Sequence, residues 1–158
     1  MLKGAINAKM CLGDKQMYRK YMENLVKWMN SKSRKPLIVW GARQVGKSYL
    51  IKDMFAEQYY KGKYIYVDCR TDHEFVKYCE THVNASEVIN YLSLDKGMQI
   101  NKDTLIIFDE VQECLPVITL MKYFCQDYRE IPIIVTGSMV RIKIQRENRK
   151  PGQENKDK

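Results

Sequence analysis

The segment GARQVGKS, residues 41–48, constrains the fold of this chain more than any other stretch of its sequence. It fits the pattern GxxxxGK[ST], follows the wholly apolar run LIVW (37–40) and leads into an amphipathic stretch. A loop of this kind folds between a buried strand and a helix, because its backbone N–H groups and the positive end of the helix then converge on one anion. The sequence therefore predicts a strand–loop–helix unit that binds phosphate.

Four residues of this loop have a specific physical role in phosphate binding. Gly41 and Gly46 allow a close backbone approach that a side chain would block. Lys47 supplies a positive charge for the terminal phosphates, and the Ser48 hydroxyl can ligate magnesium (Mg²⁺). The full set of residues predicted to contact the nucleotide is Gly41, Ala42, Arg43, Gln44, Val45, Gly46, Lys47, Ser48 and Tyr49.

Two acidic residues follow a second apolar run, in LIIFDE (105–110). A buried parallel strand would deliver both acids to its carboxyl end, beside the phosphate loop. Asp109 would then hold magnesium, directly or through water, and Glu110 would orient and deprotonate an attacking water. The plain alternative is that both acids only solubilise the end of a strand, and the presence of the phosphate loop favours the functional interpretation.

A third run, IPIIVTGS (131–138), ends in hydroxyl residues. Either Thr136 or Ser138 could hydrogen-bond the γ-phosphate or its water from the strand beside the acidic pair. The alternative is a turn built on Gly137 with incidental hydroxyls. Together with Lys47 and Glu110, these two residues complete the predicted catalytic set.

The rest of the chain alternates short apolar runs with amphipathic stretches, which is typical of buried strands separated by covering helices. We expect an α/β fold with a doubly wound parallel sheet, whose ligands bind beyond the carboxyl ends of the strands. The expected strands are 37–40, 64–68, 105–108 and 131–136. The expected helices cover 18–29, 50–55, 72–81, 86–96 and 117–128.

The net charge of +8 comes from the two ends of the chain. Residues 1–35 carry nine Lys or Arg against two acids, and residues 141–158 carry seven against three, so the body between them is net acidic. We expect a flexible basic N-terminus (1–14), one ATP-binding core (15–141) and a disordered basic tail (142–158). A second functional hypothesis is a nucleic-acid-binding module, whose basic ends grip phosphates under the control of a nucleotide switch.

Other features of the sequence indicate the cellular compartment and the identity of the nucleotide. The five cysteines form no CxxC pair, the two histidines have no ligand spacing to a cysteine, and no apolar run is long enough for a membrane span. We therefore expect a cytoplasmic protein with free thiols and no membrane partner. The guanine-reading pattern NKxD is missing, which favours ATP over GTP, and a small-molecule kinase would need an arginine-rich lid that residues 50–109 do not supply.

GARQVGKS, LIIFDEVQ and IIVTGS, at these separations, resemble the motifs of bacterial and archaeal AAA-family ATPases that carry a C-terminal region of winged-helix and nuclease-like character. The approach RKPLIVWGARQVGKSYLI and Gln112 add to the match, which covers about residues 18–141. The resemblance implies a three-layer P-loop NTPase fold of the RecA/AAA type. It also implies that ATP and magnesium are the ligands, and that Thr136 or Ser138 senses the γ-phosphate.

Members of that family continue well beyond the point where this chain becomes RENRKPGQENKDK. The resemblance therefore implies a core truncated at its C-terminus, without the fifth strand and the helical lid, which would leave strand 37–40 with an open edge. Weak hydrolysis is expected, since an arginine from the lid or from a neighbour commonly neutralises the transition state. That arginine would come from a homo-oligomer or another partner, because Arg129, Arg141 and Arg146 are expected at the surface.

Overall fold

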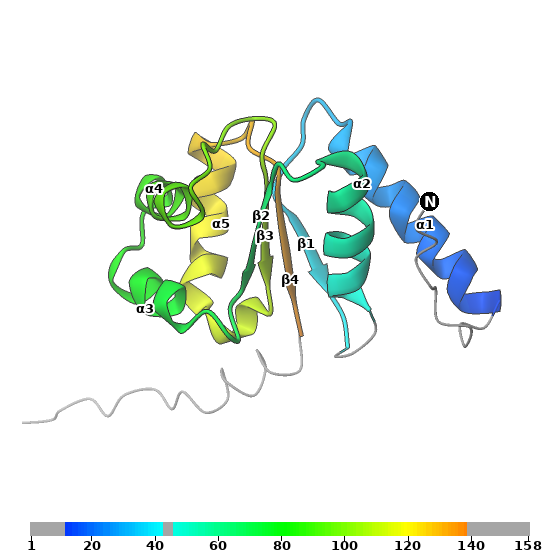
Figure 1. The fold of residues 1–158 in the computed structure, drawn as a ribbon, viewed down its shortest axis with the longest axis horizontal. Helices are drawn as coiled ribbons and strands as arrows, with labels where there is room; N and C mark the ends of the chain where they lie inside the picture. Colours follow the sequence, from blue (N-terminus) through cyan, green and yellow to red (C-terminus); the bar gives the residue numbers. More distant parts are fainter. Residues whose placement is uncertain (1–11, 43–45, 139–158) are drawn as a thin grey trace, which may run out of the picture.

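The computed structural model describes residues 12–42 and 46–138. Within them the chain forms one four-stranded parallel sheet in the order β1-β4-β3-β2, with helices on both faces (Figure 1). The strands are β1 (Leu37–Trp40), β2 (Tyr64–Asp68), β3 (Leu105–Asp109) and β4 (Ile133–Gly137). This three-layer arrangement confirms the predicted α/β fold class. The strand expected from residue 131 begins at Ile133, because the Ile131 N–H bonds the Tyr128 carbonyl in the preceding turn instead.

The helices lie close to the predicted ranges. They are α1 (Leu12–Met29), η1 (Tyr49–Ala56) continuing into α2 (Glu57–Tyr59), α3 (His73–Thr81), α4 (Ala85–Lys96), the short η2 (Val111–Glu113) and α5 (Leu115–Asp127). The N-termini of α3 and α4 are capped as side-chain chemistry dictates: the Asp72 carboxylate accepts the Phe75 N–H, and the Asn84 amide oxygen accepts the Ser86 N–H. Helix α1 is the exception, since it begins at Leu12, before the helix start that we expected at residue 18 and before the core boundary that we expected at residue 15.

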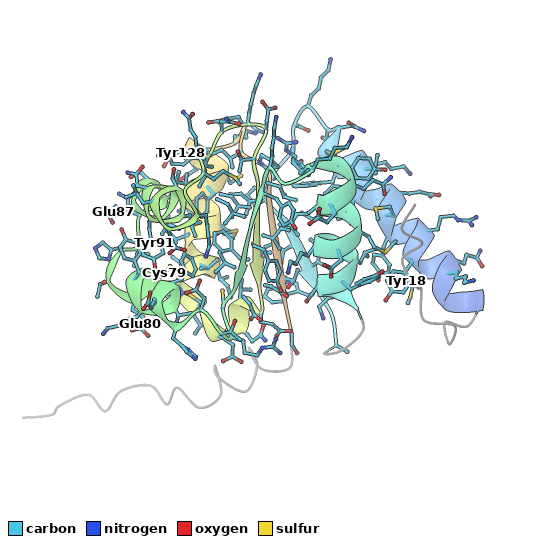
Figure 2. All side chains as sticks on the ribbon, viewed as in Figure 1. Tyr18, Cys79, Glu80, Glu87, Tyr91 and Tyr128 are labelled. Carbon is cyan, nitrogen blue, oxygen red and sulfur yellow. The ribbon has the colours of Figure 1, made fainter. Side chains whose placement is uncertain are left out.

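The strands separate two hydrophobic cores because successive side chains point to opposite faces of the sheet. Helices α3, α4 and α5 cover one face, and α1 with η1 covers the other (Figure 1). In β2, Ile65 and Val67 belong to the first core, whereas Tyr64 and Tyr66 pack against the second. Figure 2 shows the same division, with Tyr91 on the side of α4 and Tyr18 on the side of α1.

The central and edge strands differ in exposure. Every residue of β3 and β4 is buried, as expected for strands covered on both faces. Strand β1 pairs with β4 alone among the described residues, and its Ile38 side chain is 43% exposed. An edge strand of this kind offers backbone groups to another chain.

Two further observations concern the described residues only. Cys69, Cys79, Cys114 and Cys125 are free thiols, the first three of them buried in the core that α3, α4 and α5 cover. No helix there combines the length and the apolar character that a membrane crossing needs.

Candidate functional site

The phosphate loop begins directly at the end of β1. The Gly41 N–H donates to the Gly137 carbonyl at 3.2 Å, which extends the pairing of β1 with β4 past Trp40. At the far end of the loop, the Leu50 N–H donates to the Gly46 carbonyl at 3.0 Å and so starts the helix. The loop is thus anchored at both ends, as a strand–loop–helix unit requires.

Gly46 is required by both conformation and space. Its φ of +83° lies in the region that favours glycine, and the Tyr18 hydroxyl of α1 occupies the space that a Cβ would need. A side chain at position 46 would therefore be both strained and in collision with Tyr18. The predicted contact residues Arg43, Gln44 and Val45 lie outside the described residues.

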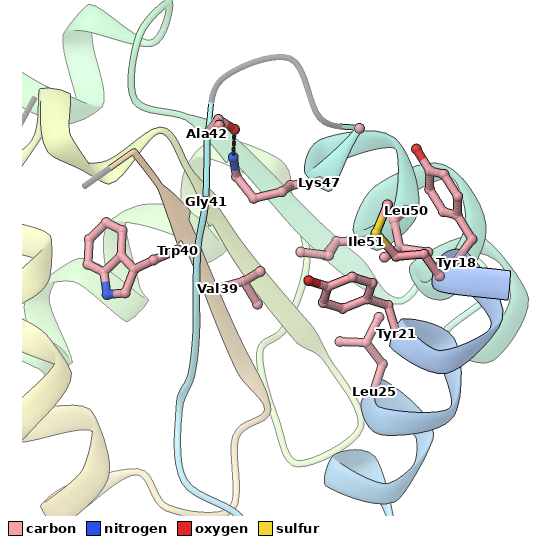
Figure 3. A pocket seen from close by; sticks show the side chains of 12 residues that line it. Tyr18, Tyr21, Leu25, Val39, Trp40, Gly41, Ala42, Lys47, Leu50 and Ile51 are labelled. Carbon is pink, nitrogen blue, oxygen red and sulfur yellow. Dashed lines mark hydrogen bonds between the residues drawn. The ribbon is translucent and has the colours of Figure 1, made fainter. Parts of the chain in front are cut away.

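Lys47 lies along the loop rather than away from it. Its Nζ donates to the Ala42 carbonyl at 2.5 Å, and its side chain passes beside Gly41 (Figure 3). A bound phosphate would meet this ammonium group within the loop itself. Tyr49, which we also expected to contact the nucleotide, is 50% exposed and does not line the cavity described below.

The helix after the loop, η1, is a π-helix, in which hydrogen bonds reach back five residues. The Glu57 N–H accordingly bonds the Lys52 carbonyl. Such wide turns are rare and occur often at functional sites. The sequence predicted a helix here, but its amphipathic spacing gave no sign of the wider turn.

Three polar side chains lie on the sheet face that η1 covers. Asp109 follows Leu105 and Ile107 on that face of β3, and Thr136 follows Ile134 on β4. Tyr66 extends from the same face of β2, where it pairs with Ile107. Strand alternation therefore turns all three side chains towards the helix that begins at the phosphate loop.

Asp109 lies at the centre of a hydrogen-bond network. Its carboxylate is 2% exposed, and Ser48 and Tyr66 each donate a hydroxyl to Oδ2 at 2.5 Å. The other oxygen, Oδ1, accepts the Thr136 hydroxyl and the Glu110 N–H, the latter at 3.0 Å. Four donors thus compensate a buried carboxylate that would otherwise be costly to desolvate.

Glu110 is held by a second set of contacts. Its backbone is left-handed, with φ 54° and ψ 44°, and Gln112 donates its amide to the Glu110 carboxylate. The same Gln112 side chain, which is fully buried, accepts the Ser138 N–H at 3.0 Å. Gln112 therefore links the second acid to the end of β4. Sequence analysis had noted Gln112 only as part of the family resemblance.

Tyr66 was missed by sequence analysis altogether. Burial, followed by the hydrogen bond to Asp109, raises the pKa of Tyr66 above its ordinary value of 10.0, so the phenol remains a donor at neutral pH. A signal did exist in the alternation YIYVD, which places Tyr64 and Tyr66 on one face of β2. What the alternation could not show is which neighbouring strand supplies the partner.

A cavity of about 270 Å³ opens between α1 and the phosphate loop. Figure 3 shows Tyr18, Tyr21 and Leu25 of α1 on one side of it, with Lys47 at the loop. The cavity is lined by Met17, Tyr18, Tyr21, Leu25, Val39, Trp40, Gly41, Ala42, Gly46, Lys47, Leu50 and Ile51. Most of these side chains are apolar, so the cavity joins an apolar wall to an anion-binding loop.

Of the candidate arginines, the structure describes Arg129, which is not brought to this site. Arg129 precedes β4, whose opposite end meets the loop through Gly137, and its side chain is exposed. Arg141 and Arg146 lie outside the described residues. Within residues 12–42 and 46–138, no cluster of three or more His, Cys, Asp or Glu side chains is arranged to hold a metal ion.

Gly137 is expected to be intolerant of any side chain. A Cβ there would collide with the Trp40 ring and come within 2.9 Å of the Gln112 Oε1 atom. We expect Gly137→Ala to lower the free energy of unfolding by about 1–3 kcal/mol, the usual cost of overpacking. Urea denaturation measures this loss.

The Trp40→Leu background provides the control, because it removes the ring that the new methyl group meets. In that background Gly137→Ala should cost clearly less than in the wild type. Equal costs in both backgrounds would contradict the steric explanation.

The P-loop class of nucleotide-binding domains is defined by two features of a parallel sheet. Here β1 leads into the GxxxxGKS loop, and two acids stand at the end of β3, beside that loop. The family model described as "AAA domain" matches residues 33–155. The chain therefore belongs to this AAA family of P-loop domains. Curated protein sequences contain no significant match to this chain.

Two solved structures are similar in fold. One is described as a DNA replication initiation factor, with a TM-score of 0.49 and 16% sequence identity, over 83% of this chain and 40% of its own. The other is AMPPCP-bound DnaA from Aquifex aeolicus, with a TM-score of 0.41 and 18% identity, over 82% and 39%. The chain thus spans about two fifths of the length of each of these structures.

Proposed function

We propose that this domain binds ATP together with magnesium at the loop 41–48 and hydrolyses it weakly. The observation that carries the proposal is the 2.5 Å hydrogen bond from the Ser48 hydroxyl to the Asp109 carboxylate. This hydrogen bond joins the phosphate loop to β3 and places two oxygen groups side by side, where they could both ligate a metal ion that is bound to the phosphates.

Ser48 and Asp109 fit magnesium chemically. Magnesium prefers oxygen ligands and is usually held by one or two carboxylates together with substrate phosphates. When bound, it would neutralise charge on the β- and γ-phosphates. In this proposal the Ser48 hydroxyl and the Asp109 carboxylate hold it, and Lys47 gives up the Ala42 carbonyl to reach the same phosphates.

The remaining residues divide the chemistry of hydrolysis. Glu110 accepts the proton of the attacking water, and the hydrogen bond from Gln112 fixes the direction of its carboxylate. Thr136 and Ser138 lie at the end of β4, where either could contact the γ-phosphate. Thr136 is hydrogen-bonded to Asp109, and Ser138 is connected to Glu110 through Gln112, so a contact with the γ-phosphate could affect both acids. A neighbouring copy or a partner supplies the arginine that neutralises the transition state.

The apolar cavity beside the loop supports a nucleoside ligand over free phosphate. Its volume of about 270 Å³ and its aromatic wall, formed by Tyr18 and Tyr21, suit a flat base next to bound phosphates. Adenine is the base that sequence analysis favours.

Calorimetric titration tests the proposal. We expect ATP to bind in the presence of magnesium, to bind more weakly when EDTA removes the metal, and to bind more tightly than GTP. Inorganic phosphate serves as the control ligand, since it can occupy the loop but not the cavity. Equal affinities for ATP and phosphate would contradict a nucleotide site, and the lack of any heat with magnesium-ATP would refute the proposal.

A further inference from the structure

One oxygen of Asp109 is shared between two hydroxyl groups from different elements. Ser48 reaches Oδ2 from the phosphate loop, and Tyr66 reaches the same atom from β2, each at 2.5 Å. We propose that Tyr66 is a positioning residue whose hydroxyl holds the Asp109 carboxylate against Ser48, so that the two oxygen groups form one preorganised magnesium site. This inference rests on the proposed function and assigns a role to a residue that the phosphate-loop and acidic motifs do not contain.

The fold places Tyr66 where it can act on both partners. Tyr66 pairs with Ile107 on β3, two residues before Asp109 and on the same face. The Lys52 ammonium group lies 4.6 Å from the centre of the Tyr66 ring, and Lys52 belongs to η1, the helix that follows Ser48. The ring is therefore held between the strand that carries the acid and the helix that begins at the loop.

The burial of Asp109 makes this hydrogen bond consequential. A carboxylate that is 2% exposed cannot replace a lost donor with bulk water. Without the Tyr66 hydroxyl, Oδ2 would keep Ser48 as its one donor, and no group on β2 would hold this oxygen, although Oδ1 would still accept the Thr136 hydroxyl and the Glu110 N–H. Groups that orient a metal ligand in this way typically affect metal affinity by about 10- to 100-fold when removed.

The neighbouring Tyr64 offers a matched control. It lies on the same strand and the same face, two residues earlier, and its hydroxyl bonds the exposed Glu57 carboxylate instead of Asp109. Tyr64→Phe removes the same atom from the same element without touching the candidate metal site. A difference between the two substitutions therefore reports on the contact with Asp109 and not on the loss of a phenol from β2.

The experiment measures how much magnesium the full chain needs to bind ATP. For Tyr66→Phe, we expect the magnesium concentration at half-maximal ATP binding to rise about tenfold or more, while binding at saturating magnesium stays close to that of the wild type. Tyr64→Phe should keep the wild-type magnesium requirement. Equal requirements in the two variants would overturn the inference.

A second measurement works without nucleotide or metal. In EDTA, Tyr66→Phe should lower the folding equilibrium constant about tenfold, and this loss should shrink in an Asp109→Asn background, because the charged acceptor is gone. If the wild type binds no magnesium-ATP, the proposed function fails, and this coupling then decides only whether the Tyr66 hydroxyl holds the Asp109 carboxylate. Equal losses in both backgrounds would overturn it.

Discussion

Replacing Lys47 with alanine is expected to remove most of the affinity of this chain for magnesium-ATP. In the proposed site Lys47 is the cation that the loop would direct at the β- and γ-phosphates, and its ammonium group already lies within the loop, 2.5 Å from the Ala42 carbonyl. Hydrogen bonds to charged groups contribute about 1.5–3 kcal/mol each, so losing the contact to two phosphates corresponds to about a hundredfold or more in the dissociation constant. Calorimetric titration with magnesium-ATP measures the change.

The matched control is Lys122→Ala. Lys122 is exposed on α5, which covers the opposite face of the sheet, so the substitution removes the same charge from the molecule but not from the site. We expect its affinity for magnesium-ATP to stay within about twofold of the wild type, because exposed distant charges are screened. An unchanged affinity in Lys47→Ala would refute the assignment of the loop.

Glu110→Gln should separate hydrolysis from binding. The amide keeps the shape of the carboxylate, and its oxygen can still accept the Gln112 amide hydrogen bond, but it cannot take a proton from water. We expect turnover to fall at least about a hundredfold, in line with the usual contribution of a general base, while the affinity for ATP stays close to that of the wild type. Phosphate release at saturating magnesium-ATP measures turnover.

Asp109→Asn is the informative comparison for this prediction. Asp109 contacts Ser48, so removing its charge should make ATP binding less dependent on magnesium. Glu110→Gln should leave this dependence unchanged. Glu80→Gln, on the exposed side of α3, controls for the loss of an acidic charge. If Glu110→Gln and Asp109→Asn impair binding alike, the division of roles between the two acids is wrong.

The parts of this domain that the sequence predicted are those encoded by short, continuous patterns. Strand β1, the loop after it and the acids that follow β3 each lie in a single segment, where apolar runs and glycine spacing are sufficient. The α/β class and most element bounds follow from the same local periodicity. The largest differences in where an element begins are at α1, which begins at Leu12 and not at residue 18, at α5, which begins two residues early, and at β4. Strand β4 begins two residues late because the Ile131 N–H is bonded within the turn after α5.

The parts that could not be predicted depend on contacts between distant segments. Tyr66 and Asp109 are separated by 43 positions and meet because β2 lies beside β3 in a fixed register. The contact between Gln112 and Ser138 likewise needs β4 to lie next to β3. A one-residue change of register between β2 and β3 would turn Tyr66 to the other face of the sheet, so no local pattern specifies its contact with Asp109.

The left-handed backbone of Glu110 has a consequence for engineering this domain. The left-handed conformation costs a residue with a side chain about 1–2 kcal/mol of conformational free energy. Glycine adopts this conformation freely, and asparagine adopts it with little penalty. Thermal tolerance and the proposed chemistry therefore favour different residues at position 110. A library of variants screened for heat resistance alone would be enriched in substitutions of Glu110. If such a substitution raised the thermal stability, it would indicate that Glu110 is retained for reactivity at the expense of stability.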